Sequence, residues 1–519
     1  MARILVAEKI ADSGLDRLRA AGHEVDIQVG LTPEELAEAI VGAQALIIRS
    51  ATKATREIIE AATDLVVIGR AGVGLDNVDT PAATERGVMV CNAPTSNIVS
   101  AAEQTMAMIL ASARNTAQAH AALTDGRWER AKWVGVELQE KTLGVVGLGQ
   151  IGKLVAIRAA AFDMKLLAYD PFISAEGAEG VGAELVTSLE EMVQRCDFLT
   201  LHVARTPETI GMINAELLAH ANPELRIINV ARGGIVNEAD LAAAVRDGVI
   251  AGAAIDVFEN EPVTESPLFD EPRIVVNPHL GASTKEAQLR AGETIAEQVE
   301  LALAGDFVPF AVNLAAKDAS ETTRPFLPLC EELGALFAGL GGHTDKLEVE
   351  FAGEIGRYEN QLGTLGVLKG YLGALTDESV SFVNGFVLAD AHGVSVETSN
   401  VAVPHDYLNS VTVRSADHEL TGSLMGLEAQ MRIVELDGHG VDLPPADHLT
   451  VVWNEDRPGM IGNIAGIIGE AGINIENMNV GQTPNGPSLM VLQTDQAVPE
   501  DVANAIVDVA GISNVSRLR

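Results

Sequence analysis

The stretch KTLGVVGLGQIG, Lys141 to Gly152, decides the fold of this chain. Within it an apolar run, Leu143 to Val146, leads into a helical pattern that spans Ile151 to Phe162. Between the two lie closely spaced glycines, namely Gly147, Gly149 and Gly152. We expect a strand, a tight turn and a helix in that order. Because glycines let backbone N–H groups approach a pyrophosphate and the helix N-terminus adds partial positive charge, the stretch predicts a dinucleotide-binding site.

A second apolar run supports this interpretation, because it ends in a carboxylate at a suitable distance. The run spans Met164 to Tyr169 and is followed by Asp170, about twenty residues beyond the glycine turn. An acidic residue there binds the adenosine ribose and repels a 2′-phosphate, so it favours NAD over NADP. The alternative is a glycine-rich turn in another α/β sheet, since such a match can arise by chance in a chain with 49 glycines.

The length and composition predict several domains built mainly from aliphatic side chains. A chain of 519 residues is long enough for about three or four domains. Aromatic residues make up only 4% of the chain, whereas 47% of its residues are apolar. Cores of Ala, Val, Ile and Leu are typical of parallel sheets covered by helices.

Charge and cysteine content exclude several classes of partner. The net charge of −38, from 73 acidic and 35 basic residues, argues against nucleic acid or a membrane as a partner. The cysteines, Cys91, Cys196 and Cys330, lack the spacing of a metal site, so we expect buried, reduced thiols and no metal. The N-terminus MARILVAEKI lacks a secretory pattern, and no run of about eighteen apolar residues occurs. We therefore expect a cytoplasmic protein.

From Arg3 to about Asn92, short apolar runs alternate with helical patterns, which indicates a doubly wound parallel sheet. Two of these runs end in a cation, Arg49 in IIRSATK and Arg70 in GRAGVGLDN. Ligands of such sheets bind beyond the carboxyl ends of the strands. We therefore expect both arginines to face one anion-binding crevice, together with Ser50, Lys53, Gly72 and Val73.

After NAPTSN, apolar residues recur at helical spacing from Ile98 to about Ala122, which predicts one long helix that crosses between domains. Beyond it, DGRWERAKWVG gathers two of the three tryptophans beside two cations: Trp128, Arg130, Lys132 and Trp133. Such a patch in an acidic chain favours an interface, and a solvated loop is the alternative.

Strands and helices continue to alternate after the glycine turn, and three later strand ends carry polar residues suited to catalysis. These are Arg232, then Asp256 with Glu261 just beyond it, and His279. Because the carboxyl ends of parallel strands meet at one edge of a sheet, we expect these side chains to form one catalytic group.

Seven motifs together resemble the D-2-hydroxyacid dehydrogenase family, in its long form: RSATK, GRAGVGLDNVD, NAPTSN, GLGQIG, NVARGGIV, DVFENEP and NPHLGAST. The resemblance covers essentially the whole chain. It implies a substrate-binding domain of residues 1–95 plus 285–313 and a Rossmann NAD-binding domain at 96–284. An α+β intervening domain would span 317–445, and a ferredoxin-like ACT domain would span 446–519.

The resemblance assigns His279 to general acid–base catalysis, Glu261 to orienting it, and Arg232 to the substrate carboxylate and carbonyl. These residue types suit the chemistry. Removing a hydride from an alcohol carbon leaves an O–H proton, for which imidazole is a suitable base near neutral pH. A carboxylate beside it stabilises imidazolium, and an arginine presents a charged fork that matches a carboxylate.

The resemblance also implies the ligand contacts. For NAD they come from Gly147, Gly149, Gln150, Ile151, Gly152, Asp170, Thr206, Ala231, Asp256 and His279. A phosphorylated hydroxyacid would be bound by Arg49, Ser50, Arg70, Gly72, Val73, Asn97 and Arg232. Arg130 or Lys132 would reach the site of a neighbouring subunit, which implies a homo-oligomer, a tetramer built from dimers.

The last segment reads βαββαβ, the ferredoxin-like order, and its DRPGMIGNIAGIIGEAGINI sequence resembles an ACT domain. The resemblance implies that L-serine binds there as an effector, through Asn454, Asp456, Gly459, Met460 and Asn474. The alternative is an ACT fold that only supports assembly.

The implied activity is NAD-dependent oxidation of D-3-phosphoglycerate to 3-phosphohydroxypyruvate, the first step of L-serine biosynthesis, with feedback regulation by L-serine. One alternative is a glyoxylate or hydroxypyruvate reductase of the same family, against which the paired Arg49 and Arg70 and the ACT-like segment count. Another is a non-catalytic NAD-sensing protein, against which the intact Arg232, Glu261 and His279 count.

Overall fold

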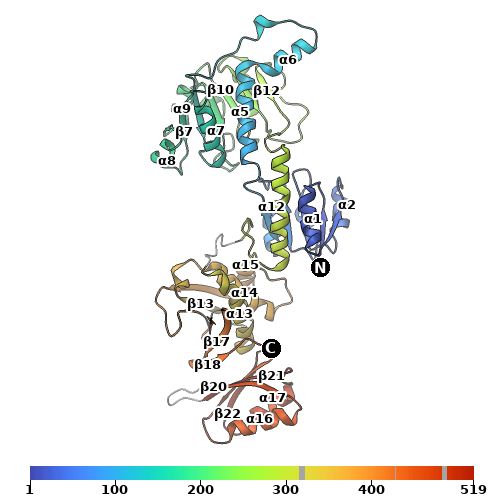
Figure 1. Ribbon diagram of the computed structural model, residues 1–519, viewed down its shortest axis with the longest axis vertical. Coiled ribbons are helices and arrows are strands. Elements are labelled where there is room, and N and C mark those ends of the chain that lie inside the picture. The colour runs from blue at the N-terminus through green and yellow to red at the C-terminus, as the bar shows by residue number, and fades with distance from the viewer. Residues whose placement is uncertain (315–321, 427, 482–487, 519) are drawn as a thin grey trace.

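The computed structural model describes residues 1–314, 322–426, 428–481 and 488–518. Figure 1 shows an elongated molecule in which four β-sheets with their helices follow one another along the long axis. The sheet of residues 142–276 lies at one end, the N-terminal sheet comes next, and the two C-terminal sheets follow. Residues 317 and 519, at which we expected domains to begin and end, lie outside the described residues.

The N-terminal sheet is parallel throughout, in the order β2-β1-β3-β4-β5. Its strands are β1 (Arg3–Val6), β2 (Glu24–Ile27), β3 (Ala45–Ile48), β4 (Val67–Arg70) and β5 (Met89–Asn92). The intervening helices are α1 (Asp12–Ala20), α2 (Pro33–Ala39), α3 (Arg56–Ala61) and α4 (Thr80–Glu85). Two apolar clusters, built mainly of aliphatic side chains, pack against this sheet. The prediction of a doubly wound parallel sheet is confirmed.

The second sheet is also parallel, in the order β12-β11-β10-β9-β6-β7-β8. Its strands are β6 (Thr142–Val146), β7 (Lys165–Tyr169), β8 (Ala183–Leu185), β9 (Phe198–Leu201), β10 (Arg226–Asn229), β11 (Gly252–Ile255) and β12 (Ile274–Val276). Its helices are α7 (Gln150–Ala160), α8 (Ala175–Glu179), α9 (Leu189–Arg195), α10 (Ala215–Leu218) and α11 (Glu238–Arg246). The strand order reverses between β6 and β9, which opens a crevice at the carboxyl ends of the strands.

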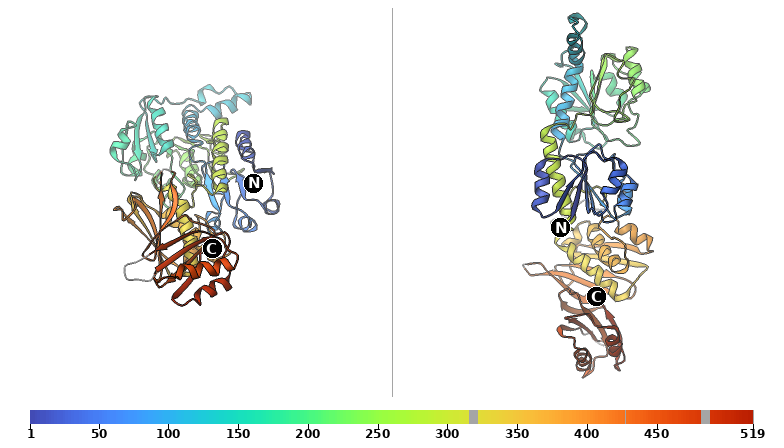
Figure 2. Two further views of the ribbon diagram at one scale, coloured as in Figure 1. Left: turned by 60° about the horizontal axis from the view of Figure 1, so that its bottom comes forward. Right: turned by 90° about the vertical axis from the view of Figure 1, so that its right-hand side faces the viewer.

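The chain crosses between these two sheets twice. Helix α5 (Ile98–Arg114) packs against α7 and β11 of the second sheet, and α12 (Lys285–Ala304) returns to pack against α1 and β4 of the first. The right-hand view in Figure 2 shows α5, in blue, beside the second sheet and α12, in yellow-green, beside the first. Near the start of both helices the hydroxyls of Ser100 and Thr284 lie 2.7 Å apart in a hydrogen bond, so the two crossings meet at one point.

The expectation of one helix from Ile98 to Ala122 is wrong. Asn115 has φ 51° and ψ 38°, a left-handed conformation that ends α5, and α6 (Thr116–Thr124) begins at the next residue. A left-handed residue turns the chain away from the axis of the preceding helix, and asparagine tolerates this conformation better than most residues. The apolar spacing continued through the break, which is why the pattern did not reveal it.

The third sheet is mixed, in the order β14-β13-β15-β16-β17-β18. Its strands are β13 (Lys346–Gly353), β14 (Ser395–Val401), β15 (Asn409–Arg414), β16 (Glu419–Met425), β17 (Gln430–Leu436) and β18 (His439–Leu443). The helices α13 (Leu327–Gly341), α14 (Gln361–Leu375) and α15 (Gly385–Ala391) accompany it. Helices α13 and α14 pack so closely that a Cβ at Gly334 or Gly370 would collide with the backbone of the other helix.

The last sheet confirms the predicted βαββαβ order. It consists of β19 (Leu449–Asn454), α16 (Met460–Glu470), β20 (Ile475–Gly481), β21 (Ser488–Thr494), α17 (Glu500–Val507) and β22 (Ile512–Arg517). The strands are antiparallel in the order β20-β21-β19-β22. One face of this sheet joins the core of the third sheet, because Val451, Trp453 and Leu518 belong to the same apolar cluster as the buried residues of α13.

Cys91, Cys196 and Cys330 are buried and unpaired, as predicted. Within the described residues, none of the helices has the length and apolar character needed to cross a membrane.

Candidate active site

A cleft of about 1210 Å³ separates the first two sheets and takes its lining from both. The N-terminal sheet contributes Lys9, Arg49, Ser50, Lys53, Arg70, Gly72, Asp76 and Asn97. The second sheet and the start of α12 contribute Arg205, Arg232, Glu261, His279 and Lys285. The cleft is therefore rich in cations, although the chain as a whole carries a net charge of −38.

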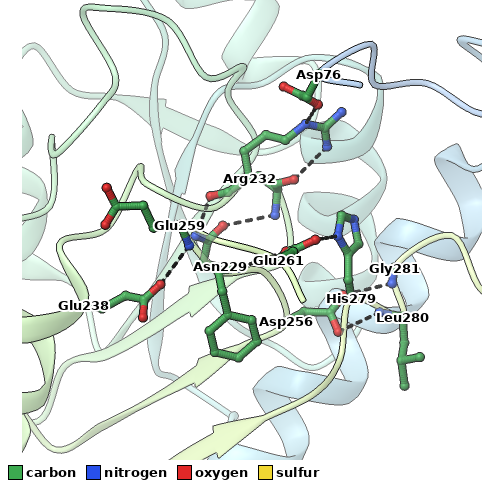
Figure 3. Close-up of polar contacts among 12 residues, drawn as sticks. Asp76, Asn229, Arg232, Glu238, Asp256, Glu259, Glu261, His279, Leu280 and Gly281 are labelled. Carbon is green, nitrogen blue, oxygen red and sulfur yellow. Dashed lines mark hydrogen bonds and ion pairs between the residues drawn. The ribbon is translucent and has the colours of Figure 1, made fainter. Parts of the chain in front are cut away.

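The cleft holds a histidine–carboxylate pair. His279 Nδ1 lies 2.7 Å from Glu261 Oε2, and Glu261 Oε1 accepts the backbone N–H of Phe258 at 2.9 Å (Figure 3). Partial burial raises the pKa of Glu261, but the hydrogen bonds from His279 and Phe258 outweigh it and hold this pKa below its usual value. The carboxylate is thus charged at neutral pH and can accept a hydrogen bond from the Nδ1–H group of His279. Nε2 of His279 is left to exchange a proton with a ligand.

A buried carboxylate holds the turn that carries His279. Asp256, at the end of β11, is 0% exposed and accepts the backbone N–H groups of Leu280 at 2.9 Å and Gly281 at 2.8 Å. Its own carbonyl accepts the N–H of His279, whose φ is 55°. Burial raises the pKa of Asp256 against the opposing effect of these N–H groups. In this structure Asp256 therefore supports the histidine from beneath and does not line the cleft.

Arg232 forms an ion pair across the cleft. Its Nε lies 3.6 Å from Asp76 Oδ2 of the other sheet, and its Nη1 donates to the carbonyl of Ala231 at 2.7 Å (Figure 3). Asn229, the last residue of β10, shapes the loop, because its side chain donates to the Arg232 carbonyl and accepts the N–H of Ala231. Asp76 thus occupies part of the surface that Arg232 would offer to a carboxylate ligand.

Arg70 lies deepest among the cations of the N-terminal sheet. Burial, together with repulsion from Arg232, lowers the pKa of Arg70 to about 10, so the guanidinium stays charged at neutral pH. Its Nε has no hydrogen-bond partner within the described residues, and the same holds for Oδ1 of Asn97. A Cβ at Gly72 would collide with this guanidinium, which explains the glycine. Val73 does not line the cleft; its carbonyl accepts the side chain of Asn92 at 2.6 Å.

The glycine turn has the geometry that a pyrophosphate-binding turn requires. Gly147 has φ 89°, and a Cβ at this position would lie 2.5 Å from the carbonyl of His202. A Cβ at Gly152 would collide with the Gly147 carbonyl, whereas one at Gly149 would meet open space. The Asp170 carboxylate accepts the Leu148 N–H at 2.8 Å and so ties the turn to the end of β7. The turn therefore leaves space for a ligand at the N-terminus of α7.

The other residues expected to contact NAD lie at the same edge of the second sheet. Gln150 and Ile151 begin α7, Thr206 follows β9, and Ala231 follows β10. The expected NAD residues other than His279 do not line the cation-rich cleft, so the two groups are neighbouring parts of the edge rather than one pocket. His202, also at the end of β9, is unsuited to acid–base chemistry, since desolvation lowers its pKa to about 4.

Several cleft residues were not predicted. Lys9 follows the end of β1 and Arg205 follows β9, so the strand-end rule that pointed to Arg49 could have found both. Asp76 lies in the quoted motif GRAGVGLDN, but nothing in the sequence showed that it would face Arg232 of another domain.

Comparison with known proteins decides the family. Residues 106–281 match the D-isomer specific 2-hydroxyacid dehydrogenase NAD binding domain, and residues 448–511 match the ACT domain. Residues 322–437 match the D-3-phosphoglycerate dehydrogenase intervening domain. The chain is 40% identical to D-3-phosphoglycerate dehydrogenase of Synechocystis sp. over 99% of its length and 94% of that protein. It is 42% identical to the Mycobacterium tuberculosis enzyme of that name, over 97% of this chain and 96% of that protein.

The chain belongs to the D-3-phosphoglycerate dehydrogenase family.

Solved structures of this family and its relatives cover the first two sheets. A Thermus thermophilus protein aligns with a TM-score of 0.56 and 34% identity over 60% of this chain and 99% of its own. The NAD⁺-bound 3-phosphoglycerate dehydrogenase of Entamoeba histolytica aligns with a TM-score of 0.51 and 30% identity, over 60% of this chain and 98% of its own. The protein is an NAD-dependent 2-hydroxyacid dehydrogenase of the D-3-phosphoglycerate dehydrogenase family.

Arg130 and Lys132, which we expected at a subunit interface of this dehydrogenase, lie away from its own cleft. They form the short helix η1 (Arg130–Lys132), beyond α6 at one end of the molecule. Lys132 Nζ lies 4.9 Å from the Trp133 ring, and the nearby Trp128 is 81% exposed. Neither cation can serve the cleft of its own chain in this arrangement.

The expected effector residues of the dehydrogenase separate into two groups. Asn454, at the end of β19, is buried with no partner for Oδ1 among the described residues, and Asp456 is exposed. Gly459, with φ 97°, and the buried Met460 begin α16. Asn474 follows the other end of α16, and its backbone N–H bonds to Asp495. Because α16 has 11 residues and therefore spans about 16 Å, one chain does not bring Asn474 to the others.

Proposed function

We propose that the protein oxidises D-3-phosphoglycerate to 3-phosphohydroxypyruvate with NAD, the first step of L-serine biosynthesis. One observation carries the proposal: the cleft combines the His279–Glu261 pair and Arg232 with the cations Arg49 and Arg70 on its opposite wall. The His279–Glu261 pair and Arg232 suit oxidation of a hydroxyacid, and the cations Arg49 and Arg70 suit recognition of a phosphate.

The chemistry follows from the positions of these side chains. The substrate carboxylate binds Arg232 and replaces Asp76 as its partner. This contact orients the carbon that carries the hydroxyl group. His279 Nε2 would take the hydroxyl proton as the hydride leaves the same carbon, so that the alcohol becomes the 2-oxo acid. Glu261 accepts Nδ1–H throughout, so it fixes the tautomer in one direction and stabilises imidazolium in the other. Reduction of the 2-oxo acid reverses these steps.

The cofactor fits the edge of the second sheet. The Gly147–Gly152 turn would hold the pyrophosphate and Asp170 the ribose, while Gln150, Ile151, Thr206 and Ala231 would flank it. NAD supplies the hydride acceptor of the reaction. Asp256 would act mainly by holding the turn of His279, since both its oxygens already accept backbone N–H groups.

A glyoxylate or hydroxypyruvate reductase remains the main alternative within the family. Neither substrate carries a phosphate, so neither explains why Arg49, Lys53 and Arg70 gather in one wall of the cleft of an acidic protein. A non-catalytic NAD sensor would not need the His279–Glu261 pair.

We further propose that L-serine regulates the enzyme through the ACT domain. Asn454, whose Oδ1 has no partner among the described residues, would bind one part of the amino acid together with Asp456 and the Gly459–Met460 turn. Asn474 of a second ACT domain would complete the site, because it lies at the far end of α16 in its own chain. This requires a homo-oligomer, for which we propose a tetramer built from dimers, with Arg130 or Lys132 reaching the partner's cleft. We expect the enzyme in the cytoplasm.

The test is NADH formation from D-3-phosphoglycerate and NAD, followed by absorbance with and without L-serine. Turnover that serine lowers is the expected result. Absence of turnover would contradict the activity. Turnover that serine leaves unchanged in both rate and KM would contradict the effector role. The variant Asp456→Ala should keep the turnover and lose the response to serine, and loss of both would instead point to a structural role.

A further inference from the structure

The segment that carries Arg49, Ser50 and Lys53 has no secondary structure of its own. It follows β3, the central strand of the N-terminal sheet, and runs between the ends of β1 and β4. Arg49 is only partly buried, and Ser50 and Lys53 are exposed to the cleft. Three side chains suited to a phosphate therefore depend on a loop whose shape must be fixed by its neighbours.

On one side the loop is held by a carboxylate. Glu8, just beyond β1, accepts three backbone N–H groups with its Oε1 atom, from Arg49 at 2.9 Å, Ala51 at 3.1 Å and Thr52 at 2.8 Å. Successive backbone N–H groups that converge in this way form a nest that commonly binds an anion. Here the anion is part of the chain, so these N–H groups are already occupied.

On the other side the loop is held by an amide. Nδ2 of Asn77, in the loop after β4, donates to the carbonyls of Arg49 at 2.8 Å and Thr52 at 2.6 Å. The two loops also pair through their backbones, since the Ala54 N–H bonds to the Asn77 carbonyl and the Asp79 N–H bonds to the Ala54 carbonyl. Glu8 thus accepts hydrogen bonds from the backbone N–H groups of the loop, and Asn77 donates hydrogen bonds to its backbone carbonyls.

We propose that Glu8 and Asn77 are positioning residues, which together hold the 49–53 loop in the shape that aims Arg49, Ser50 and Lys53 at the substrate phosphate. This inference rests on the proposed function, since it presupposes a phosphorylated substrate. It also states how the phosphate is bound: by cationic side chains, because Glu8 occupies the backbone nest of the loop.

Because Glu8 is negatively charged, its removal can distinguish a role in holding the loop from a purely electrostatic effect on the substrate. A carboxylate beside a phosphate site repels the substrate, so its removal would lower KM if Glu8 acted only through its charge. If Glu8 acts by holding the loop, its removal raises KM despite the more favourable charge. The sign of the change in KM therefore distinguishes the two roles.

The experiment compares reduction of 3-phosphohydroxypyruvate and hydroxypyruvate by NADH in the full-length enzyme. For Asn77→Ala, which removes two hydrogen bonds, we expect KM for the phosphorylated substrate to rise about tenfold. The value of kcat and the kcat/KM for hydroxypyruvate should change by no more than about twofold. Glu8→Ala should raise the same KM, and Glu8→Gln, which keeps an acceptor oxygen, should raise it less.

Asn313 provides a matched control in the same domain. Its side chain also clamps backbone, by donating to the Val88 carbonyl and accepting the Val90 N–H, but it does not line the cleft. Asn313→Ala should lower thermal stability without changing the preference between the two substrates.

Two outcomes overturn the proposal: equal effects of Asn77→Ala on both substrates, or a lower KM for the phosphorylated substrate in Glu8→Ala. A wild-type enzyme that shows no preference for the phosphorylated substrate would instead contradict the proposed function. The two failures are therefore distinguishable.

Discussion

The N-terminal and C-terminal halves of the molecule are packed in opposite ways. In the N-terminal half each parallel sheet has its own apolar clusters, and the cleft between the sheets is lined by charged side chains. In the C-terminal half the third sheet, α13 and one face of the ACT sheet share a single apolar cluster. The first arrangement allows two domains to close on a ligand, whereas the second makes two domains one unit.

This difference indicates how regulation would reach the active site. The C-terminal unit contacts the N-terminal sheet in two ways. In the loop before α15, Ser381 Oγ donates to the Gly87 carbonyl at 2.9 Å and Val383 lies in the core of that sheet. Leu362 and Leu365 of α14 also pack against Phe307. A ligand that moves the ACT domain would therefore move the third sheet with it and act on the substrate-binding side of the cleft. The His279–Glu261 pair lies on the other side of the cleft, so such a movement would reach it only when the cleft opens or closes.

The largest expected effect comes from removing the proposed catalytic base, which lies in the N-terminal half. His279→Ala should lower kcat by about 10²- to 10⁴-fold, because general acid–base catalysis is lost. NADH binding, measured by fluorescence titration, should change little, since the glycine turn is untouched. A variant that keeps a near-normal rate would contradict the acid–base role of His279.

A second substitution tests the apolar cluster that the third sheet shares with the ACT sheet in the C-terminal unit. Trp453 is 9% exposed and packs beside His418 of the third sheet, with ring centroids 5.9 Å apart. Trp453→Ala should lower the free energy of unfolding of this unit by about 3–5 kcal/mol, measured by denaturation followed by circular dichroism. Leu408→Ala, at a position of the same unit that is 86% exposed, is the control and should change it by less than about 0.5 kcal/mol.

The Trp453→Ala variant also tests whether the two C-terminal domains unfold as one unit. If it is, denaturation of Trp453→Ala should shift the third sheet and the ACT domain together, while kcat without serine stays within about twofold of wild type. Separate transitions of the two domains would contradict the single unit.

Arg70→Ala tests the wall of the cleft opposite the catalytic pair. Loss of a charge-assisted contact should raise KM for D-3-phosphoglycerate by about 10- to 100-fold, with a smaller effect on kcat. The control is Arg56→Ala, which removes an exposed arginine of the same sheet that pairs with Glu85 and should leave KM unchanged. Equal losses for phosphorylated and unphosphorylated substrates would remove the phosphate assignment.

The smallest expected effect concerns pH. The hydrogen bonds from His279 and Phe258 hold the pKa of Glu261 below its usual value, so its carboxylate is charged at neutral pH and stabilises a protonated imidazole beside it. Reduction needs that proton and should decline as pH rises. In Glu261→Gln, which lacks the charged partner, the decline should begin at a lower pH than in the wild-type enzyme, as measured by pH profiles of kcat/KM for reduction. If the rate declined at the same pH in both enzymes, the Glu261 carboxylate would not influence the proton on His279.

The sequence predicted those features that depend on local pattern. The apolar run, glycines and carboxylate around Lys141–Gly152 specified a strand, turn and helix, and Gly147 indeed has φ 89°. Strand ends also predicted that His279 and Glu261 would meet, since the carboxyl ends of parallel strands share an edge.

Features that depend on contacts between distant segments were not predictable in this way. Asp76 meets Arg232 only because two domains face each other, and Glu8 meets the 49–53 loop only because β1 and β3 are neighbours. The shared core of α13 and the ACT sheet likewise arises between segments that each show an ordinary apolar pattern. Asn115 is a local exception, because asparagine is compatible with both a helix and its end.

The central claim is that the cation-rich wall selects a phosphorylated hydroxyacid for the catalytic pair opposite. The most direct test is the ratio of kcat/KM for 3-phosphohydroxypyruvate and hydroxypyruvate in the wild-type enzyme with NADH. We predict a preference of at least about 100-fold for the phosphorylated substrate. Equal values would contradict the account, and a preference for hydroxypyruvate would identify the protein as a reductase of unphosphorylated 2-oxo acids.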